Sequence, residues 1–441
     1  MQDFFSAFGI THDNKGPLNQ LHVAAAAGSL HGVRELLSGG SIDIDQGNPD
    51  GATPLMLAAE LGHTQVVKYL IDRGAYPYEA TDSQGCTALH LASANGYVES
   101  CRLLIGVVLD LDLEVMTKDG YTCLHLSAIG NHTDVMKVLI EAGEDTDSRL
   151  PDGRTPLHVA SMEGHVEAIR VLLSFRANPL LTSRTTPVNT YVPLDTAVRH
   201  GRLEVVRELI GQLGLNGCAG ASGGTEALRL AAQNDHVDIL RVLVEAGVED
   251  MGTALVGAIA FGREGPVKFL LQRKQRSGRN TKAYVNMFAQ IGEQLTGNPL
   301  LLALGFARHR PLPRIVRLLV DAGADGTSAV TTRAHEPDAT PLEYVSRFIR
   351  EKKMDGEEAT EEQLDKLEAI RRLLLCVEAV HAASWLWQED DAPSLARGAK
   401  GNRRRTKTES PQLGRMLPVL RIRARKGGLT PETAFRFSRK L

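Results

Sequence analysis

The chain has 441 residues, of which 43% are hydrophobic and 23% are charged, a composition typical of folded proteins and not of disordered ones. No stretch reaches the ~18 consecutive apolar residues that a membrane-spanning helix needs, and residues 1–15 lack the pattern of a signal peptide. The formal net charge of −3 hides an uneven distribution, because residues 392–441 hold 14 basic and 2 acidic residues. The chain has 50 basic and 53 acidic residues in total, so this segment carries +12 and residues 1–391 carry −15.

A seven-residue motif recurs after a short extension at residues 1–16. Five clear copies lie at 19–25, 53–59, 87–93, 122–128 and 155–161, and the fifth reads Thr-Pro-Leu-His-Val-Ala-Ser. Weaker copies follow, in which the leucine at the third position is the main shared feature. This leucine occurs at positions 21, 55, 89, 124, 157, 194, 228, 255, 300 and 342, so the spacings are 34, 34, 35, 33, 37, 34, 27, 45 and 42. Such a period predicts a stack of similar units.

Each copy predicts a pair of helices and a tight turn. In the second copy, Thr53 suits a helix N-cap and Pro54 suits the first helical turn, where a missing N–H costs nothing. A second segment, 66–71, then carries apolar residues at helical spacing. The Asp50-Gly51 pair suits the tight turn of a hairpin that projects between repeats.

The motif Thr-Pro-Leu-His-x-Ala at this period resembles the ankyrin repeat. The resemblance divides residues 17–383 into regular repeats one to five (17–180) and degenerate repeats six to ten (181–383). It implies an all-α repeat solenoid, a stack of helix-turn-helix units with projecting hairpin loops, in which each unit buries its apolar face against the next. It also implies recognition of a partner protein through the hairpin tips and the concave face of the first helices.

Some segments depart from the period. The spacing of 27 before Leu255 leaves too little chain for a hairpin, so we expect a simple turn there. The spacing of 45 contains an insertion at 272–297, which opens with basic residues and continues into an expected extra helix at 283–288. The spacing of 42 contains a polar loop at 327–338, and glycines predict a further loop at 211–224.

We expect the last repeat to be longer than the others and to cap the stack. A helix near 344–352 should be followed by a longer one from about Glu361. The apolar stripe of this longer helix consists of Leu364, Leu367, Ile370, Leu374 and Val377. Trp385 and Trp387 follow, and they either pack over the end of the stack or form an exposed aromatic patch that binds a peptide.

The remaining chain is basic. A linker at 384–411 holds the tryptophans and then a basic run, and the tail at 412–441 has an expected short strand and short helix. The basic patch consists of Arg403, Arg404, Arg405, Lys407, Arg421, Arg423, Arg425 and Lys426. Three interpretations stay open: a nuclear import or nucleic-acid-binding element, a solvated linker, or an intramolecular mask that lies on the acidic stack.

The histidines and cysteines do not predict an enzyme. Equivalent histidines of successive repeats are expected to hydrogen-bond between neighbouring loops: His22, His90, His125 and His158. A second set is expected at the turns between helices for a similar structural reason: His63, His165 and His236. The five cysteines form no CxxC pair and are interpreted as reduced thiols. Motifs of metal, nucleotide or acyl-transfer chemistry are absent from the sequence, so we expect no catalytic residue, cofactor or metal.

The main hypothesis is a non-enzymatic scaffold or adaptor that binds an unidentified partner protein. Its binding residues are the variable positions between framework residues: Asp50, Glu60, Leu61, Gln84, Asn95, Lys118, Tyr121, Ile129, Asp152, Arg154, Met162 and Glu163. An apolar centre within a charged rim is typical of an interface, although scattered surface hydrophobicity is the ordinary alternative. We expect a cytoplasmic monomer; the alternative function is a nuclear regulator whose basic tail contacts nucleic acid or an acidic partner.

Overall fold

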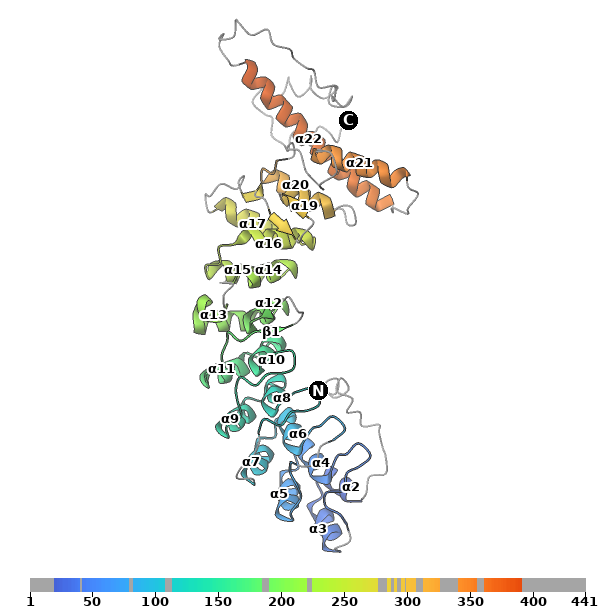
Figure 1. Cartoon of the computed structure of the whole chain (residues 1–441), viewed down its shortest axis with the longest axis vertical. Helices are drawn as coiled ribbons and strands as arrows, with labels where there is room; N and C mark the ends of the chain where they lie inside the picture. Colours follow the sequence, from blue (N-terminus) through green and yellow to red (C-terminus); the bar gives the residue numbers. More distant parts are fainter. Residues whose placement is uncertain are drawn as a thin grey trace. The chain divides into compact units, whose positions relative to one another are not determined.

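The computed structural model describes residues 20–39, 42–78, 82–107, 113–184, 190–219, 224–276, 284–286, 289–291, 295–297, 299–306, 312–325, 340–354 and 361–390. The chain forms two compact units, Met1–Ala227 (unit 1) and Leu228–Leu441 (unit 2), and the boundary falls within helix α14 (Thr225–Gln233). Each unit is built from repeated pairs of helices (Figure 1).

Unit 1 contains a first and a second helix in each of six repeats. The first helices are α2 (Gln20–Ala26), α4 (Pro54–Glu60), α6 (Ala88–Asn95), α8 (Cys123–Ile129), α10 (Pro156–Glu163) and α12 (Pro193–Arg199). The second helices are α3 (Leu30–Ser38), α5 (Thr64–Asp72), α7 (Val98–Gly106), α9 (Thr133–Glu141), α11 (Val166–Ser174) and α13 (Leu203–Cys218). Each first helix contacts the next first helix, and each second helix contacts the next second helix. The predicted all-α solenoid is therefore confirmed.

The first helices begin where the sequence motif predicts. The side chain of Thr53 accepts a hydrogen bond from the backbone N–H of Met56, and Thr87 and Thr122 cap α6 and α8 in the same way. The sixth repeat has no threonine at this position. There the Asp195 carboxylate accepts from the N–H of Val192 and caps α12 from inside the helix.

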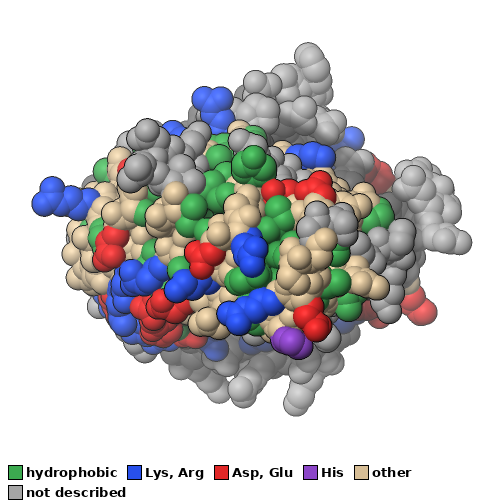
Figure 2. Space-filling model, turned by 90° about the horizontal axis from the view of Figure 1, so that it is seen from below, with side chains coloured by type: hydrophobic (Ala, Val, Ile, Leu, Met, Phe, Trp, Pro, Cys, Tyr) green, Lys and Arg blue, Asp and Glu red, His purple; other side chains and the backbone are tan. Residues whose placement is uncertain are grey.

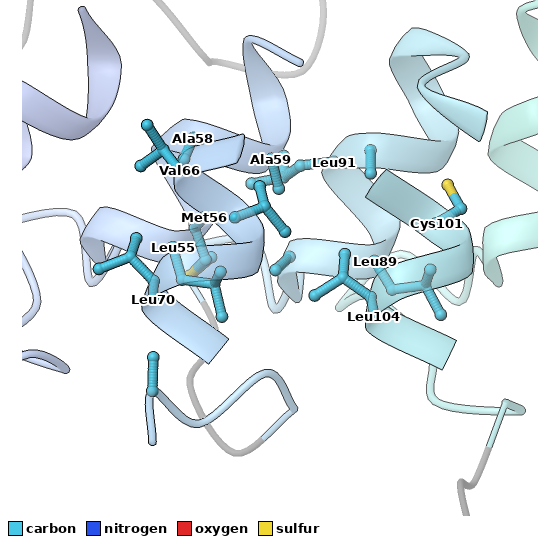
Figure 3. Close-up of a cluster of buried hydrophobic side chains, with 14 of the residues drawn as sticks. Leu55, Met56, Ala58, Ala59, Val66, Leu70, Leu89, Leu91, Cys101 and Leu104 are labelled. Carbon is cyan, nitrogen blue, oxygen red and sulfur yellow. The ribbon is translucent and has the colours of Figure 1, made fainter. Parts of the chain in front are cut away.

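Apolar side chains from both helices of each repeat form the core. Leu55 of α4 and Leu89 of α6 are buried beside Leu70 and Leu104 of the second helices α5 and α7 (Figure 3). Full burial of one leucine stabilises the fold by roughly 1.5–3 kcal/mol, and Ala58 and Ala59 leave room for close helix packing. Since each repeat buries this face against its neighbour, the unit forms one continuous core.

Two expectations for unit 1 need correction. The loop expected at 211–224 is helical up to Cys218, because α13 continues through this segment with a kink at Gly214, where φ is +68°. A short antiparallel hairpin also stands in the sixth repeat, in which β1 (Ser183–Arg184) pairs with β2 (Thr190–Tyr191). At the other end of the unit, hydrophobic side chains reach the surface between charged ones (Figure 2), and Val23 of α2 is 52% exposed.

Unit 2 repeats the two-helix pattern less regularly. Its helices after α14 are α15 (Val237–Glu245), α16 (Met251–Ala260), α17 (Glu264–Arg276), α19 (Pro299–Phe306), α20 (Pro313–Asp321), α21 (Pro341–Met354) and α22 (Glu361–Asp390). A hairpin of β3 (Ala289–Ile291) and β4 (Leu295–Gly297) lies in the insertion. The five residues between α15 and α16 confirm the expected short turn, although Asp250, and not Thr253, caps α16.

The insertion and the last repeat differ in detail from expectation. The basic start of the insertion extends α17 to Arg276, and the sequence did not predict the β3–β4 hairpin at all. The extra helix expected at 283–288 lies partly outside the described residues. Of the predicted stripe of α22, Leu367, Ile370 and Leu374 are buried, whereas Leu364 and Val377 are half-buried. The helix continues to Asp390, so Trp385 and Trp387 lie within it and not beyond it.

The polar loop at 327–338 and the basic tail lie outside the described residues, as do all eight residues of the basic patch. Nothing in the structure tests the hypotheses for the tail. Among the helices that the structure describes, none is long and apolar enough to cross a membrane.

Candidate functional site

A ladder of buried histidines joins the first helices of unit 1. Nε2 of His22, His90, His125 and His158 lies 3.0, 3.0, 3.3 and 3.0 Å from the backbone carbonyl oxygens of Ala52, Val115, Arg154 and Tyr191 in the following loops. Nδ1 of the last three accepts a hydrogen bond from the threonine that caps the same helix, at 2.9, 3.0 and 2.9 Å. The predicted structural role of these four histidines is confirmed.

The protonation state of this ladder follows from its geometry. Because Nδ1 accepts, the single proton of each ring is on Nε2 and is donated to the neighbouring loop. Burial lowers the pKa of His90, His125 and His158 to about 4, so these rings are neutral at pH 7. They hold the loops in place and are not available as acids or bases.

A second ladder fixes the C-terminal ends of the first helices. Nε2 of His63, His132 and His165 lies 2.8, 3.0 and 2.9 Å from the carbonyl oxygens of Ala26, Ala94 and Ile129. In the sixth repeat Arg202 replaces the histidine and donates from Nε to the Met162 carbonyl at 2.8 Å. This ladder holds the backbone of the predicted binding residues Ile129 and Met162. His236, which we expected to act similarly, stands at the N-cap of α15 without a side-chain capping bond.

Tight turns, here called fingers, project at 48–52, 82–86, 117–121 and 150–154. In each finger the fourth residue is a glycine with positive φ, such as Gly51 at +84°, whose N–H donates to the first residue. Neighbouring fingers are linked by backbone bonds, for example from Ser83 N–H to Asp50 O at 2.6 Å and from Lys118 N–H to Gln84 O at 2.9 Å. Pro151 has no N–H, so this series of backbone bonds is interrupted before the finger at 150–154.

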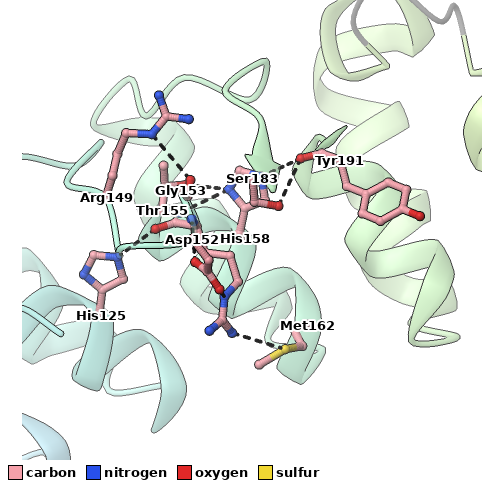
Figure 4. Close-up of polar contacts among 10 residues, drawn as sticks. His125, Arg149, Asp152, Gly153, Thr155, His158, Met162, Ser183 and Tyr191 are labelled. Carbon is pink, nitrogen blue, oxygen red and sulfur yellow. Dashed lines mark hydrogen bonds and ion pairs between the residues drawn. The ribbon is translucent and has the colours of Figure 1, made fainter. Parts of the chain in front are cut away.

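The variable residues of the fifth repeat lie together (Figure 4). The Arg154 guanidinium donates from Nε to Asp152 Oδ2 at 2.6 Å and lies 3.8 Å from the sulfur of Met162 through Nη1. A finger residue therefore touches a residue of the first helix. We use the name finger face for the surface made of the fingers, the β1–β2 hairpin and the variable C-terminal positions of α4, α6, α8, α10 and α12.

The structure places the other predicted binding residues on this face with different exposures. Tyr121, Ile129 and Met162 are half-buried, whereas Leu61 is 36% exposed. Tyr121 makes an edge-to-face contact with His125, with ring centroids 6.3 Å apart.

The polar predicted residues also take part in local structure. Asn95 donates to the carbonyl of Leu91 at 2.9 Å, and Lys118 donates from Nζ to the carbonyl of Ser83 at 2.6 Å. Asp50, Glu60, Gln84 and Glu163 are half-buried. The structure thus brings Asp152, Arg154 and Met162 together, while Leu61 stands apart in the second repeat.

Sequence reasoning identified the sixth repeat but missed the residues that it contributes to the finger face. Arg199 occupies the position of Met162 one repeat later, and its guanidinium lies over the ring of Tyr191, 5.6 Å from the ring centroid. In unit 2, Phe261 occupies the position of Leu61 and is 51% exposed. Applying the offsets of the regular repeats to the degenerate ones would have identified both residues.

A buried acid was also missed. Glu144 stands where the equivalent residues of neighbouring repeats are Ala75 and Ala177, and all three are buried. Its Oε1 accepts from the Leu124 N–H at 2.7 Å, while Oε2 has no hydrogen-bond partner among the described residues. Burial, opposed by the hydrogen bonds from Thr122 and Leu124, raises the pKa of this carboxyl to about 8. The group is closed off from solvent and affects stability.

The described cysteines are free thiols in the interior. Cys86, Cys101, Cys123 and Cys218 are buried, and burial raises the pKa of each thiol. A buried neutral thiol is a poor nucleophile. Within the described ranges, no group of three or more His, Cys, Asp or Glu side chains is arranged to hold a metal ion.

Comparison with known families agrees with this architecture. The family model for ankyrin repeats (three copies) matches residues 21–114, 107–183, 143–221 and 194–283, which together span more than half of the chain. The chain therefore belongs to the ankyrin-repeat family, whose members are generally protein-interaction modules and typically not enzymes. No curated protein matches the chain.

Proposed function

We propose that this protein is a non-enzymatic scaffold or adaptor that binds a partner protein on the finger face of unit 1. The supporting observation is that the side chains of this face fall into two groups, one that joins the repeats and one that is left for a partner. The side chains that recur from repeat to repeat, such as His125 and His165, form hydrogen bonds that hold neighbouring repeats together. The variable positions, such as Tyr121 and Met162, stand between them and are only half-buried.

The physical chemistry of this face suits a protein partner. Ile129 and Met162 are consecutive along the row of first helices, with Tyr121 on the adjacent finger and charged residues at the edge. Apolar and aromatic anchors within a polar rim supply most of the binding energy of typical interfaces. Because the ladders fix the backbone on both sides, the face is ordered before binding, which lowers the entropic cost of association.

The double variant Tyr121→Ala/Met162→Ala tests this proposal. We expect capture of partner proteins by the full chain to weaken by roughly thirtyfold, since truncation of two central anchors at about 1 kcal/mol each costs about 2 kcal/mol. Capture is measured by quantitative pull-down, and the fold is checked by circular dichroism.

A matched control is provided by Tyr76→Ala/Met116→Ala. These residues are also a tyrosine and a methionine, are 58% and 44% exposed, and lie in connecting loops outside the finger face. If both double variants retain wild-type capture, the finger face is not the binding site.

The charge of +12 in residues 392–441 favours a second candidate function. In this proposal the basic tail contacts nucleic acid or an acidic partner, and the protein acts in the nucleus as well as in the cytoplasm. Binding of DNA or RNA should then fall steeply with salt through counterion release and should disappear when residues 392–441 are deleted. Equal binding of DNA or RNA with and without this segment would reject the second candidate function.

A further inference from the structure

Arginines gather at one end of the finger face. Arg154 belongs to the finger at 150–154 and Arg149 directly precedes it. Arg184 belongs to the β1–β2 hairpin, and Arg199 and Arg202 belong to the sixth repeat. They are connected through shared neighbours: the N–H of Arg184 donates to Asp152 O at 2.7 Å, and Arg202 donates to the carbonyl of Met162. We call these five residues the arginine cluster.

The charges of this cluster act on one another. Partial burial and the positive charges of Arg199 and Arg202 lower the pKa of His200, with a smaller effect from Arg154 and an opposing one from Glu163. The positive charges of Arg199, Arg202 and Arg154 thus all act on the partly buried ring of His200.

Most of these cations lack an acidic partner. Arg154 pairs with Asp152, but the side chains of Arg149 and Arg202 bind only backbone carbonyls. Among the described residues, neither Arg184 nor Arg199 has a carboxylate within ion-pair distance. With Asp152 and Glu163 as the neighbouring acids, the cluster has an excess of positive charge.

Three arginines of the second helices behave differently. Arg170 forms two hydrogen bonds with Glu208, at 2.9 and 2.7 Å, and Arg102 and Arg207 lie 3.9 and 3.7 Å from acids on their own helices. These three charges are balanced locally, whereas within the described residues only Arg154 of the arginine cluster has an ion pair.

We propose that the arginine cluster recognises an acidic peptide segment of the partner. One carboxylate pairs with Arg199 and another with Nη2 of Arg154, which has no partner among the described residues because Asp152 bonds only Nε, while an apolar side chain packs on Met162. This inference rests on the proposed function and specifies its partner. The planar guanidinium group suits two parallel hydrogen bonds to a carboxylate, and Arg199 is held over Tyr191 with its edge available.

A nucleic acid fits this surface less well. A duplex carries one charge per about 1.7 Å and needs an extended basic track. The finger face instead carries Asp50, Glu60 and Asp119 on the repeats that precede the cluster, and Asp152 and Glu163 within it. The same cluster repels the basic tail, so it also disfavours masking of this end of the face by residues 392–441.

Selection of peptides from a random phage-displayed library on the full chain tests the inference. We expect the selected peptides to be enriched in Asp and Glu around an apolar residue, and a selected peptide to bind about tenfold more weakly to Arg154→Gln/Arg199→Gln. Glutamine keeps donor groups and length while it removes the charge. The control Arg102→Gln/Arg207→Gln removes two charges from the second helices and should leave the affinity unchanged.

Three outcomes would overturn the inference. The first is a set of selected peptides without an acidic excess, and the second is equally tight binding of these peptides to the Arg154→Gln/Arg199→Gln variant and the wild type. The third is tighter binding of a single-stranded oligonucleotide than of the selected peptides to the cluster. Peptides that require Tyr121 and Met162 but not the arginines would leave the proposed function intact and reject only the acidic partner. Peptides that require neither pair would reject both.

Discussion

In the two units, different side chains form the hydrogen bonds that join successive repeats. In unit 1, buried histidines such as His125 and His158 donate to the loop of the next repeat. In unit 2 the position of His158 is occupied by Val256 in α16, and the insertion provides a replacement, because the Tyr284 hydroxyl donates to the Met251 carbonyl at 2.6 Å. The insertion therefore breaks the period but supplies a polar contact between repeats.

The insertion also provides a second replacement contact between repeats in unit 2, through Asn286. Nδ2 of Asn286 donates to the carbonyl of Gly323 at 3.1 Å, and its Oδ1 accepts from the Asp325 N–H at 2.7 Å. Arg263 retains the second ladder by donating to the carbonyl of Gln233 at 2.8 Å, as Arg202 does in unit 1. The comparison teaches that a degenerate repeat keeps its cross-repeat hydrogen bonds while it changes the residues that make them.

The largest expected effect comes from removing a histidine of the ladder. His158→Ala leaves the hydroxyl and the N–H of the buried Thr155 without their acceptor and removes one of the two donors to the Tyr191 carbonyl. We expect a loss of about 4 kcal/mol in the free energy of unfolding. Val256→Ala, at the equivalent position of unit 2, should cost only about 1 kcal/mol, because it removes only packing. Urea unfolding followed by circular dichroism measures both; equal losses would contradict the proposed difference between the units.

Glu144 should make unit 1 less stable as the pH rises. Because its pKa is raised from 4.5 to about 8, its favourable contribution is complete below pH 4.5 and is lost as the pH rises through 8. One pKa unit corresponds to 1.36 kcal/mol. The free energy of unfolding of Glu144→Gln, relative to that of the wild type, should therefore rise by about 3 kcal/mol between pH 4.5 and pH 7.

Urea unfolding of both proteins at several pH values checks this dependence. Since the comparison is made at each pH, the titration of other groups cancels. A constant difference across this range would show that Glu144 is not the buried acid described here.

A smaller effect is expected from Tyr284→Phe, which removes only the hydroxyl that donates to Met251. The free energy of unfolding should fall by about 1 kcal/mol, the usual value of a single neutral hydrogen bond. The exposed Tyr76 provides the matched control, because Tyr76→Phe should change nothing. If Tyr284→Phe also left the free energy of unfolding unchanged, the insertion would not compensate for the missing histidine.

The smallest effect is expected at the surface. Arg170 bridges α11 and α13 through Glu208, but the pair is solvent-exposed on the arginine side and is screened by salt. Arg170→Ala should leave the urea midpoint unchanged at physiological ionic strength. A clear shift would mean that surface ion pairs contribute to repeat stacking in unit 1.

The sequence predicted the parts of the fold that depend on local pattern. The Thr-Pro-Leu-His motif defined the helix starts and the histidine ladder, and the short spacing before Leu255 defined the reduced turn. The kink at Gly214 shows why the loop predicted at 211–224 was wrong for residues 211–218. Glycine allowed a local break at φ +68°, but the apolar residues around it continued as helix up to Cys218. The β3–β4 hairpin carries no strong local signal of its own.

The sequence predicted where the candidate site lies, but it did not predict the positive charge of the arginine cluster. Tyr121, Ile129 and Met162 follow from the offsets within each repeat, whereas the arginine cluster depends on side chains from two repeats that meet only in the folded stack. Glu144 was missed because its sequence context resembles that of Ala75, and only burial shows that a carboxyl occupies an apolar position.

Site-specific photo-crosslinking tests the central claim most directly, namely that the finger face of unit 1 binds the partner. Benzoylphenylalanine is introduced at Tyr121 on the finger face and, in a separate protein, at Lys137, an exposed residue of the second helix α9. The account predicts a crosslinked partner from position 121 and none from position 137. Crosslinking from position 137 alone would contradict it.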